Sequence, residues 1–265
     1  MSRNRLVRTV LLLGYAFLYA PIVLLVATSF NPSRLTTVLA GFSLRWYGVL
    51  WQDQALRRAA ALSLGIATVA ATAATVLGLA AAYALARFGR FRARPLFAAL
   101  LGAPLVLPDV LLGLALLLLF VEIERLFGWP ARGALTIALA HTAIALSYVA
   151  IVVEARLTDG GTELEEAAQD LGAAPWQAFL RITLPLVAPA LLSGWLLAFT
   201  LSLDDLVVAS FVSGPGATTL PMAVFSALKL GITPELNALA TVILAVVTGA
   251  MLLAYAAQRR ASRPA

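Results

Sequence analysis

Long apolar runs decide what this chain can fold into. A helix needs about 18 to 20 consecutive apolar residues to cross the hydrocarbon core of a bilayer, and six stretches reach that length. Only 12% of the 265 residues are charged, about half of what a soluble domain carries. We therefore predict one all-α polytopic membrane domain over residues 1–265. Its six transmembrane helices would cover residues 10–29, 60–86, 97–120, 134–154, 186–209 and 235–257.

The first apolar run shares features with a cleaved signal peptide, because three arginines precede it and residues 27–29 are small. Its length and the proline at its middle, Pro21, favour an uncleaved span instead. Cleavage would leave the remaining topology unchanged.

Basic residues are distributed unevenly between the predicted loops. With the amino terminus inside, 12 of the 19 fall on the cytoplasmic side, which follows the positive-inside rule and not the single stripe of a nucleic-acid site. Both termini are then cytoplasmic, although Arg57 and Arg58 beside the second span argue for the opposite sign there. The cytoplasmic set is Arg3, Arg5, Arg8, Arg87, Arg90, Arg92, Arg94, Arg156, Arg181, Arg259, Arg260 and Arg263, and the outer set is Arg34, Arg45, Arg57, Arg58, Arg125, Arg132 and Lys229.

Small residues mark the second span, where Ala74, Gly78 and Ala82 recur at a spacing of four. Small side chains let membrane helices approach closely, so this spacing predicts a packed interior helix, with a merely alanine-rich composition as the alternative. After the fifth span, residues 222–230 form an apolar piece too short to cross, which predicts a re-entrant or interfacial helix on the outer side. Thr233 and Pro234 then suit the start of the last span.

Several kinds of chemistry are excluded by residue type. The chain has no cysteine and one histidine, His141, so we expect no metal site, no catalytic residues and no intramembrane enzyme. We expect His141 to pack or to form hydrogen bonds. A phosphate-binding loop requires Gly-Lys-Ser/Thr, and the only lysine, Lys229, follows Leu228. The chain therefore has no ATPase site of its own.

A polar segment, residues 160–185, separates the fourth and fifth spans. Thr162 with Glu165 fits a capping box, so a helix should run from Glu163 to Leu171. Gly172 supplies a stop. Pro175 suits the first turn of a second short helix, which would end before Pro185 opens the fifth span. This predicts a helix-turn-helix with a tight elbow, whose alternative role is an amphipathic pair resting on the bilayer surface.

The same segment resembles the signature of inner-membrane permease subunits of bacterial ABC importers: Glu-Ala-Ala, three residues, Gly, nine residues, then Ile-x-Leu-Pro. In that family the elbow docks on an ATPase subunit and carries its closure to the membrane helices. The resemblance implies a dimer of ATPase subunits that hold ATP and Mg, a second homologous permease subunit and a periplasmic or extracellular solute-binding protein. It also implies a location in the bacterial inner membrane. The implied coupling residues are Glu166, Ala167, Ala168, Gly172, Ile182, Leu184 and Pro185.

Three aspartates in or near the predicted spans are candidates for a substrate pathway, because an ionisable side chain within a membrane is costly and marks a path or a partner. Asp109 follows Pro108 halfway along the third span, where a kinked helix would turn the carboxylate toward a central path. Asp204 and Asp205 lie near the outer end of the fifth span. Negative potential without matching cations favours a cationic cargo. The alternatives are a helix break with a carboxylate reaching water, for Asp109, and a solvated helix end.

The residues around these aspartates resemble the second permease subunit of spermidine/putrescine importers. The matching stretches are Pro108-Asp109, residues 202–205, 218–221 and 233–238. The resemblance implies polyamine import, with ferric iron, thiamine and aminophosphonates as the alternative cargoes of similar relatives. An ion-driven carrier working alone is a further alternative, which the absence of an evident inverted repeat disfavours.

Overall fold

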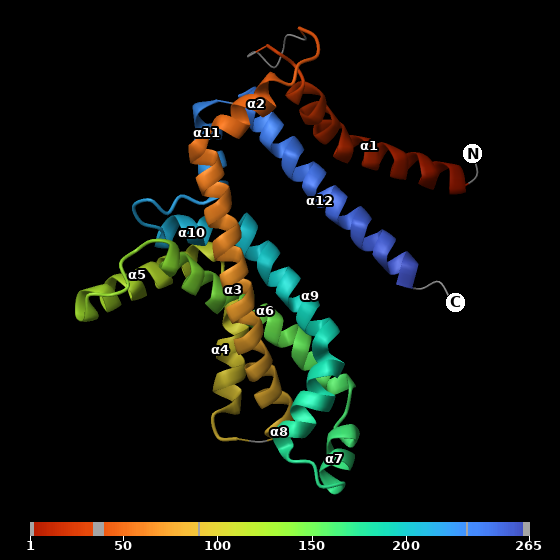
Figure 1. Cartoon of the computed structure of the whole chain (residues 1–265), viewed down its shortest axis with the longest axis vertical. Helices are drawn as coiled ribbons and strands as arrows, with labels where there is room; N and C mark the ends of the chain where they lie inside the picture. The colour runs from red at the N-terminus through yellow and green to blue at the C-terminus, as the bar shows by residue number, and fades with distance from the viewer. Residues whose placement is uncertain (1–2, 34–39, 90, 232, 262–265) are drawn as a thin grey trace. The chain divides into compact units, whose positions relative to one another are not determined.

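A computed structural model describes residues 3–33, 40–89, 91–231 and 233–261, without the side chains of residues 3–6, 230 and 250–261. Every element in the described chain is helical, which confirms the all-α prediction (Figure 1). Three arginines whose side of the membrane was predicted lie outside the described residues, namely Arg34, Arg90 and Arg263. The side chains of Arg3, Arg5, Arg259 and Arg260 lie outside them as well. The helices are α1 (Arg3–Ser29), α2 (Arg45–Gln52), α3 (Gln54–Arg87), α4 (Arg94–Val106), α5 (Asp109–Phe127), α6 (Ala134–Asp159), α7 (Glu163–Asp170), α8 (Pro175–Ala178), the π-helical turn η1 (Phe179–Thr183), α9 (Leu184–Asp204), α10 (Val207–Val212), α11 (Leu220–Leu230) and α12 (Pro234–Ala261).

The described residues group into two compact units. The terminal unit comprises residues 1–57 and 224–265, and the central unit comprises residues 58–223. In the terminal unit α1 and α2 both pack on α12, and the Asn237 amide donates a hydrogen bond to Thr28 Oγ1 at 3.1 Å. The central unit contains both candidate functional sites.

Four described helical segments are long and apolar enough to cross a bilayer, namely Val7–Ser29, Gln54–Arg87, Ala134–Asp159 and Pro175–Asp204. They contain the predicted first, second and fourth spans and most of the fifth. The predicted sixth span lies within α12, whose side chains are described only as far as Gly249, a stretch shorter than 18 residues. The count of six spans therefore stays a prediction.

The third predicted span, residues 97–120, is not one helix. It breaks between α4 and α5, which meet at a bend of 118°. The cause is Pro108, because proline pushes the preceding residue out of helical geometry, and Leu107 and Pro108 both have extended backbones, with ψ of 138° and 141°. Pro104 lies inside α4 without breaking it. The pair forms a broken span or a re-entrant loop, which is far more than the predicted kink.

The fifth predicted span, residues 186–209, also ends early. α9 stops at Asp204, Asp205 has an extended ψ of 124°, and the chain starts again as α10. Residues 205–209 therefore lie in a break and a short new helix. The reason is that the Asp205 carboxylate accepts hydrogen bonds from the backbone N–H groups of Val208 and Ala209, and so caps the new helix instead of continuing the old one.

The second span packs as its small residues predict. Ala74 and Ala82 are fully buried, and a Cβ added at Gly78 would lie 2.8 Å from Val149 Cγ1 on α6. Val149 in turn is fully buried and faces Gly194 on α9. Close approach of α3, α6 and α9 therefore depends on glycine, as in other membrane helix pairs.

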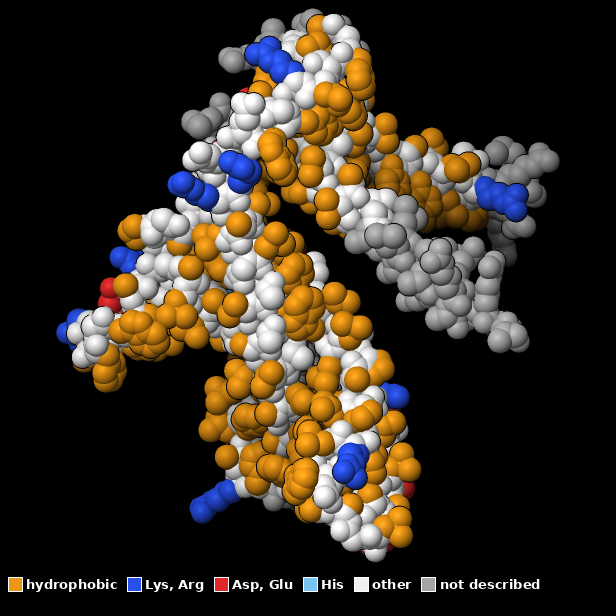
Figure 2. Space-filling model, in the orientation of Figure 1, with side chains coloured by type: hydrophobic (Ala, Val, Ile, Leu, Met, Phe, Trp, Pro, Cys, Tyr) orange, Lys and Arg blue, Asp and Glu red, His pale blue; other side chains and the backbone are white. Residues whose placement is uncertain are grey.

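Hydrophobic side chains cover most of the visible face of the central unit, with few charges among them (Figure 2). Many large ones are exposed, including Leu64, Val69 and Leu77 on α3 and Leu192 and Leu196 on α9. An apolar surface of this extent needs lipid or another protein against it. The helices therefore have the exterior of a membrane protein.

Candidate functional site: a polar elbow and an acidic cavity

The elbow forms as the sequence predicts. α7 runs from Glu163 to Asp170, and Gly172 has a φ of +89°, a left-handed conformation that glycine adopts without steric cost. The N–H of Gly172 bonds to Gln169 O at 2.9 Å, and the N–H of Ala173 bonds to Ala168 O at 3.0 Å. These bonds close the end of α7 in the manner of a glycine C-cap.

The second half of the elbow differs from the prediction, because it is not a separate short helix. α8 begins at Pro175, as expected, but continues through the turn η1 directly into α9. Pro185 has no N–H to donate, and a wider π-helical turn just before it lets the chain pass without a break. The run Pro175–Asp204 is therefore one continuous helical rod of 30 residues.

The predicted capping box is wrong. Thr162 makes no side-chain cap bond, and Glu165 turns inward instead. Its carboxylate accepts three bonds of 3.1 to 3.2 Å from Arg87 at the end of α3 and one of 2.8 Å from the Thr183 hydroxyl in η1. Arg87 Nη2 also donates to Gly161 O at 2.6 Å. We call Arg87, Glu165 and Thr183 the elbow brace.

The elbow brace is nearly closed to water, with Arg87 and Glu165 side chains 12% and 11% exposed. It joins α7 to α3 and to η1, the turn that leads into α9. Sequence reasoning missed it because Glu165 also matched a local capping pattern, and the partner lies 78 residues away. An arginine ending a span beside an acidic segment was the only available signal.

The predicted coupling residues lie mainly on the outside of the elbow. Glu166, Ala167, Gly172 and Pro185 are exposed, whereas Ala168, Ile182 and Leu184 are half-buried. Large apolar side chains stand beside them, with Leu171 89% exposed and Trp176 63% exposed. The exposed surface of the elbow thus combines small residues, the Glu166 carboxylate and uncovered apolar side chains, which is the composition of a docking surface.

The three predicted pathway aspartates line one cavity of about 370 Å³ in the central unit. The two helix breaks bring them together: Asp109 begins α5 after the α4–α5 bend, Asp204 ends α9, and Asp205 lies in the gap before α10. The remaining wall is largely apolar. It comprises His141, Ile144, Ala145, Tyr148, Leu201, Ser202, Leu206, Val207 and Val208.

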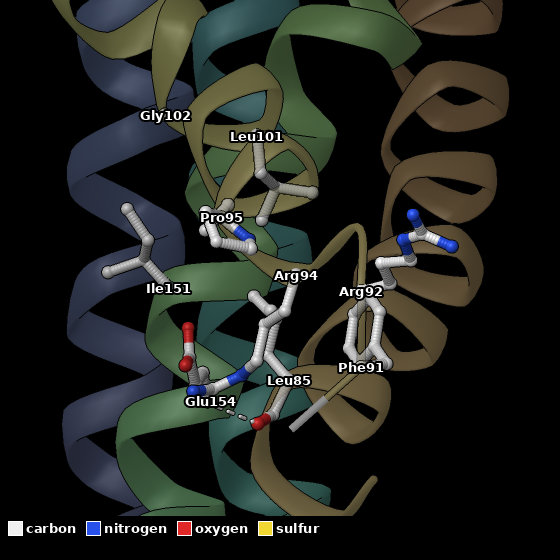
Figure 3. Close-up of a pocket in the computed structure, with 10 residues that line it drawn as sticks. Leu85, Phe91, Arg92, Arg94, Pro95, Leu101, Gly102, Ile151 and Glu154 are labelled. Carbon is white, nitrogen blue, oxygen red and sulfur yellow. Dashed lines mark hydrogen bonds between the residues drawn. The ribbon is translucent and has the colours of Figure 1, made fainter. Parts of the chain in front are cut away.

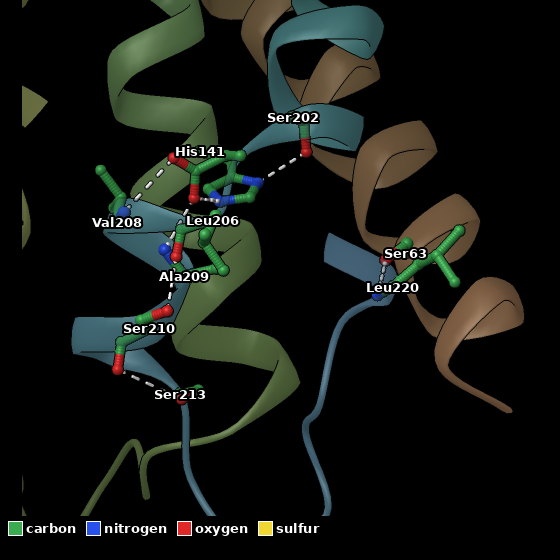
Figure 4. A network of polar contacts seen from close by, with 10 residues as sticks. Ser63, His141, Ser202, Leu206, Val208, Ala209, Ser210, Ser213 and Leu220 are labelled. Carbon is green, nitrogen blue, oxygen red and sulfur yellow. Dashed lines mark hydrogen bonds and ion pairs between the residues drawn. The ribbon is translucent and has the colours of Figure 1, made fainter. Parts of the chain in front are cut away.

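His141 points toward Ser202 in a polar network within this wall (Figure 4), and the network also includes Asp205. His141 Nε2 lies 3.1 Å from Asp205 Oδ2, and Nδ1 lies 2.6 Å from Ser202 Oγ. A carboxylate only accepts, so Nε2 donates to Asp205, and Nδ1 shares the second hydrogen bond with the Ser202 hydroxyl. The predicted hydrogen-bonding role of His141 is confirmed. The network ties α6 to the end of α9 and the start of α10.

The three aspartates differ in how many hydrogen-bond partners their carboxylates have. Both Asp205 oxygens have partners, since Oδ1 accepts from Val208 N and Oδ2 from Ala209 N and His141. Within the described residues, Asp109 and Asp204 form no hydrogen bond or ion pair with another residue, and both are exposed to the cavity side. Asp205 builds the wall, while Asp109 and Asp204 present open carboxylates.

No group of three or more metal-binding side chains exists among the described residues. The cavity is lined by carboxylates, one imidazole and hydroxyls together with apolar side chains.

Comparison with known proteins gives a consistent result. A family described as "Binding-protein-dependent transport system inner membrane component" matches residues 74–263. The chain is 58% identical over 255 residues to the putrescine transport system permease protein PotI of Escherichia coli K12, covering 96% of this chain and 91% of that protein. It is 40% identical to the spermidine/putrescine permease PotC of the same strain, covering 87% and 85%. A sulfate permease, CysT, is 33% identical, covering 92% and 90%.

Solved structures match as well. A bacterial ABC transporter involved in alginate import superposes with a TM-score of 0.70 at 17% identity, covering 98% of both chains. The MetNI methionine transporter gives 0.62 at 20% identity, covering 82% of this chain and 99% of that one. At these identities the likeness shows the fold.

Proposed function

The chain belongs to the family of binding-protein-dependent transport system inner membrane components, the permeases of ABC importers, and from this premise we propose that it forms half of a translocation path for putrescine or a related polyamine. The observation that supports this choice of cargo is the acidic cavity, in a chain 58% identical to a putrescine permease. The path's cation-binding groups are Asp109 and Asp204.

The cavity suits an alkyl diamine in chemistry. Two open carboxylates on different helices, Asp109 and Asp204, provide acceptors for ammonium groups, and apolar side chains such as Ile144 and Leu201 line the space around them. A sulfate dianion would meet like charges there, which costs free energy. The 33% identical sulfate permease shows that this family includes an anion carrier, so the aspartates are the feature that favours a cation here.

The energy for transport comes from partner subunits in this proposal. The outer side of the elbow, with Glu166, Ala167 and Gly172, docks on an ATPase subunit of a dimer that holds ATP and Mg. The long rod from Pro175 to Asp204 joins that surface to the cavity wall. A second homologous permease completes the path, and an external solute-binding protein delivers the cargo.

The orientation follows from charge. Arg87 ends α3 beside the elbow, Arg92 and Arg94 lie at the start of α4, and Arg156 lies in the last turn of α6, which leads into the elbow. The positive-inside rule assigns that end to the cytoplasm. The proposal therefore includes cytoplasmic termini and a bacterial inner membrane.

Uptake of labelled putrescine by the complete importer in proteoliposomes tests the function. Asp109→Asn removes one open charge and should lower uptake about tenfold or more, while the subunits still assemble and hydrolyse ATP. Glu122→Gln, an exposed carboxylate on α5 paired with Arg125, is the matched control and should transport normally.

Normal putrescine uptake by Asp109→Asn would remove the cavity from the cargo's path. Uptake of another solute in place of putrescine would retain the machinery and replace the cargo with ferric iron, thiamine or an aminophosphonate. Uptake by the chain alone, without an ATPase, would support an ion-driven carrier instead.

A further inference from the structure

A larger cavity, of about 590 Å³, lies in the central unit where α3 ends, α4 begins and α6 passes (Figure 3). Its walls are largely apolar and include Pro95, Leu101 and Ile151. Charges of both signs line it as well, because Arg92 and Arg94 come from the start of α4 and the turn before it, and Glu154 comes from α6. The cavity shares no lining residue with the acidic cavity or the elbow brace.

The charged groups at this cavity keep hydrogen-bonding capacity that the described residues do not use. Arg94 Nη2 donates one bond of 3.0 Å to Leu85 O, which leaves the other donors of its guanidinium. The ion pairs among the described residues are Arg87–Glu165, Arg125–Glu122 and His141–Asp205. None of them includes Arg92, Arg94 or Glu154. An occupant with an anion, a cation and an apolar body would satisfy all three.

The cavity's position adds to this chemistry. Leu85 lies two residues before Arg87, which ends the candidate span α3, and Ile151 and Glu154 lie in the last turns of the candidate span α6. Arginines at span ends lie at the level of lipid headgroups. The apolar wall of Ala98, Leu101 and Ile151 then runs from that level along the spans.

We propose that this cavity binds a phospholipid with a zwitterionic amine headgroup, phosphatidylethanolamine. Arg92 and Arg94 contact the phosphate, because guanidinium groups match phosphate oxygens. The primary ammonium donates hydrogen bonds to Glu154, and an acyl chain covers the apolar wall. A quaternary ammonium has no N–H to donate, and phosphatidylglycerol has no cation for Glu154, so the headgroup preference rests on Glu154. The proposal does not depend on the cargo or on ATP.

Native mass spectrometry of the purified full-length chain tests it, with phosphatidylethanolamine, phosphatidylcholine and phosphatidylglycerol of identical acyl chains as probes. The wild-type chain should retain phosphatidylethanolamine about fivefold more strongly, the scale of one partly exposed charge-assisted contact. Glu154→Gln should reduce this preference to below about twofold, and Glu154→Lys should shift it toward phosphatidylglycerol. The control Glu122→Gln should keep it.

Two further variants separate headgroup binding from loss of fold. Arg92→Ala with Arg94→Ala should weaken both lipids equally, and Ile151→Trp should fill the cavity and exclude both, while the helix content of each variant stays that of the wild type. Equal retention of the two lipids by the wild-type chain would overturn the proposal, as would a preference that survives in Glu154→Gln. Loss of the bound lipid on assembly with the second permease subunit would assign the cavity to that subunit instead.

Discussion

The two ends of the rod from Pro175 to Asp204 differ in which carboxylates have partners. At the elbow, Glu165 is closed, meaning that Arg87 and Thr183 bond to its carboxylate, and small and apolar side chains are exposed beside it. At the cavity, only Asp205 is closed in this sense, by bonds from His141 and two backbone N–H groups. Asp109 and Asp204 remain open there.

This difference separates residues that hold the fold from residues that are free to act on something else. A buried charge without partners is costly, so a closed carboxylate is part of the structure. An open carboxylate beside a cavity is available to a cargo, and an open small-residue surface is available to a protein. The following predictions test that separation, from the largest expected effect to the smallest.

Arg87→Ala should lower the free energy of unfolding by about 3–5 kcal/mol, because it leaves Glu165 buried without its cation. The double variant Arg87→Met with Glu165→Leu removes both charges and should cost much less. Denaturant unfolding in detergent micelles measures both. If single and double variants lose the same stability, the brace is not a coupled pair. Arg125→Ala, at the exposed Glu122–Arg125 pair, should stay within about 0.5 kcal/mol.

Asp205→Ala should cost about 1–3 kcal/mol, since His141 and the N–H groups of Val208 and Ala209 lose their acceptor. Asp204→Ala, at the neighbouring position, should change stability by less than about 0.5 kcal/mol. The same unfolding measurement compares them. Equal losses at the two positions would abolish the distinction between a closed and an open aspartate.

Gly172→Val should cost about 1–2 kcal/mol, because valine is strained at a φ of +89°. It should also reduce the number of solutes transported per ATP hydrolysed, since the elbow would change shape. Gly65→Ala, at a helical glycine with open space around it, is the control for adding a side chain to a glycine. A stable Gly172→Val importer with an unchanged transport-to-ATP ratio would contradict docking through this elbow.

Glu166→Gln should leave stability within about 0.5 kcal/mol, because the side chain is exposed. Its effect should appear only in the complex, as weaker stimulation of ATP hydrolysis by the loaded binding protein. Glu163→Gln, also exposed in the first turn of α7, should stimulate normally. Identical behaviour of the two variants would place the docking contact away from Glu166.

Local signals in the sequence predicted the elbow well and its anchoring poorly. Gly172 ends a helix and Pro175 begins one, and both effects follow from backbone geometry. Both residues act as predicted. Glu165 matched a local capping pattern but forms an ion pair with the distant Arg87 instead. The ion pair prevails because a buried arginine without a counter-charge costs more free energy than an uncapped helix end. The break at Pro108 was visible in the sequence, but its 118° angle was not.

The acidic residues show the same division. Their rarity in apolar segments identified Asp109, Asp204 and Asp205 as candidates, and a single cavity contains all three. Their different states required the positions of His141 and of the α10 backbone, which no spacing along the chain predicts.

The sequence alone determined that this chain is a helical membrane protein with a polar elbow, because hydropathy, glycine and proline act within a few residues of where they stand. Only the tertiary structure decided which charges are closed and which are open. That depends on side chains that meet across 18 to 78 residues of chain. The free energy of a charge is set by its surroundings in space and not by its neighbours in sequence.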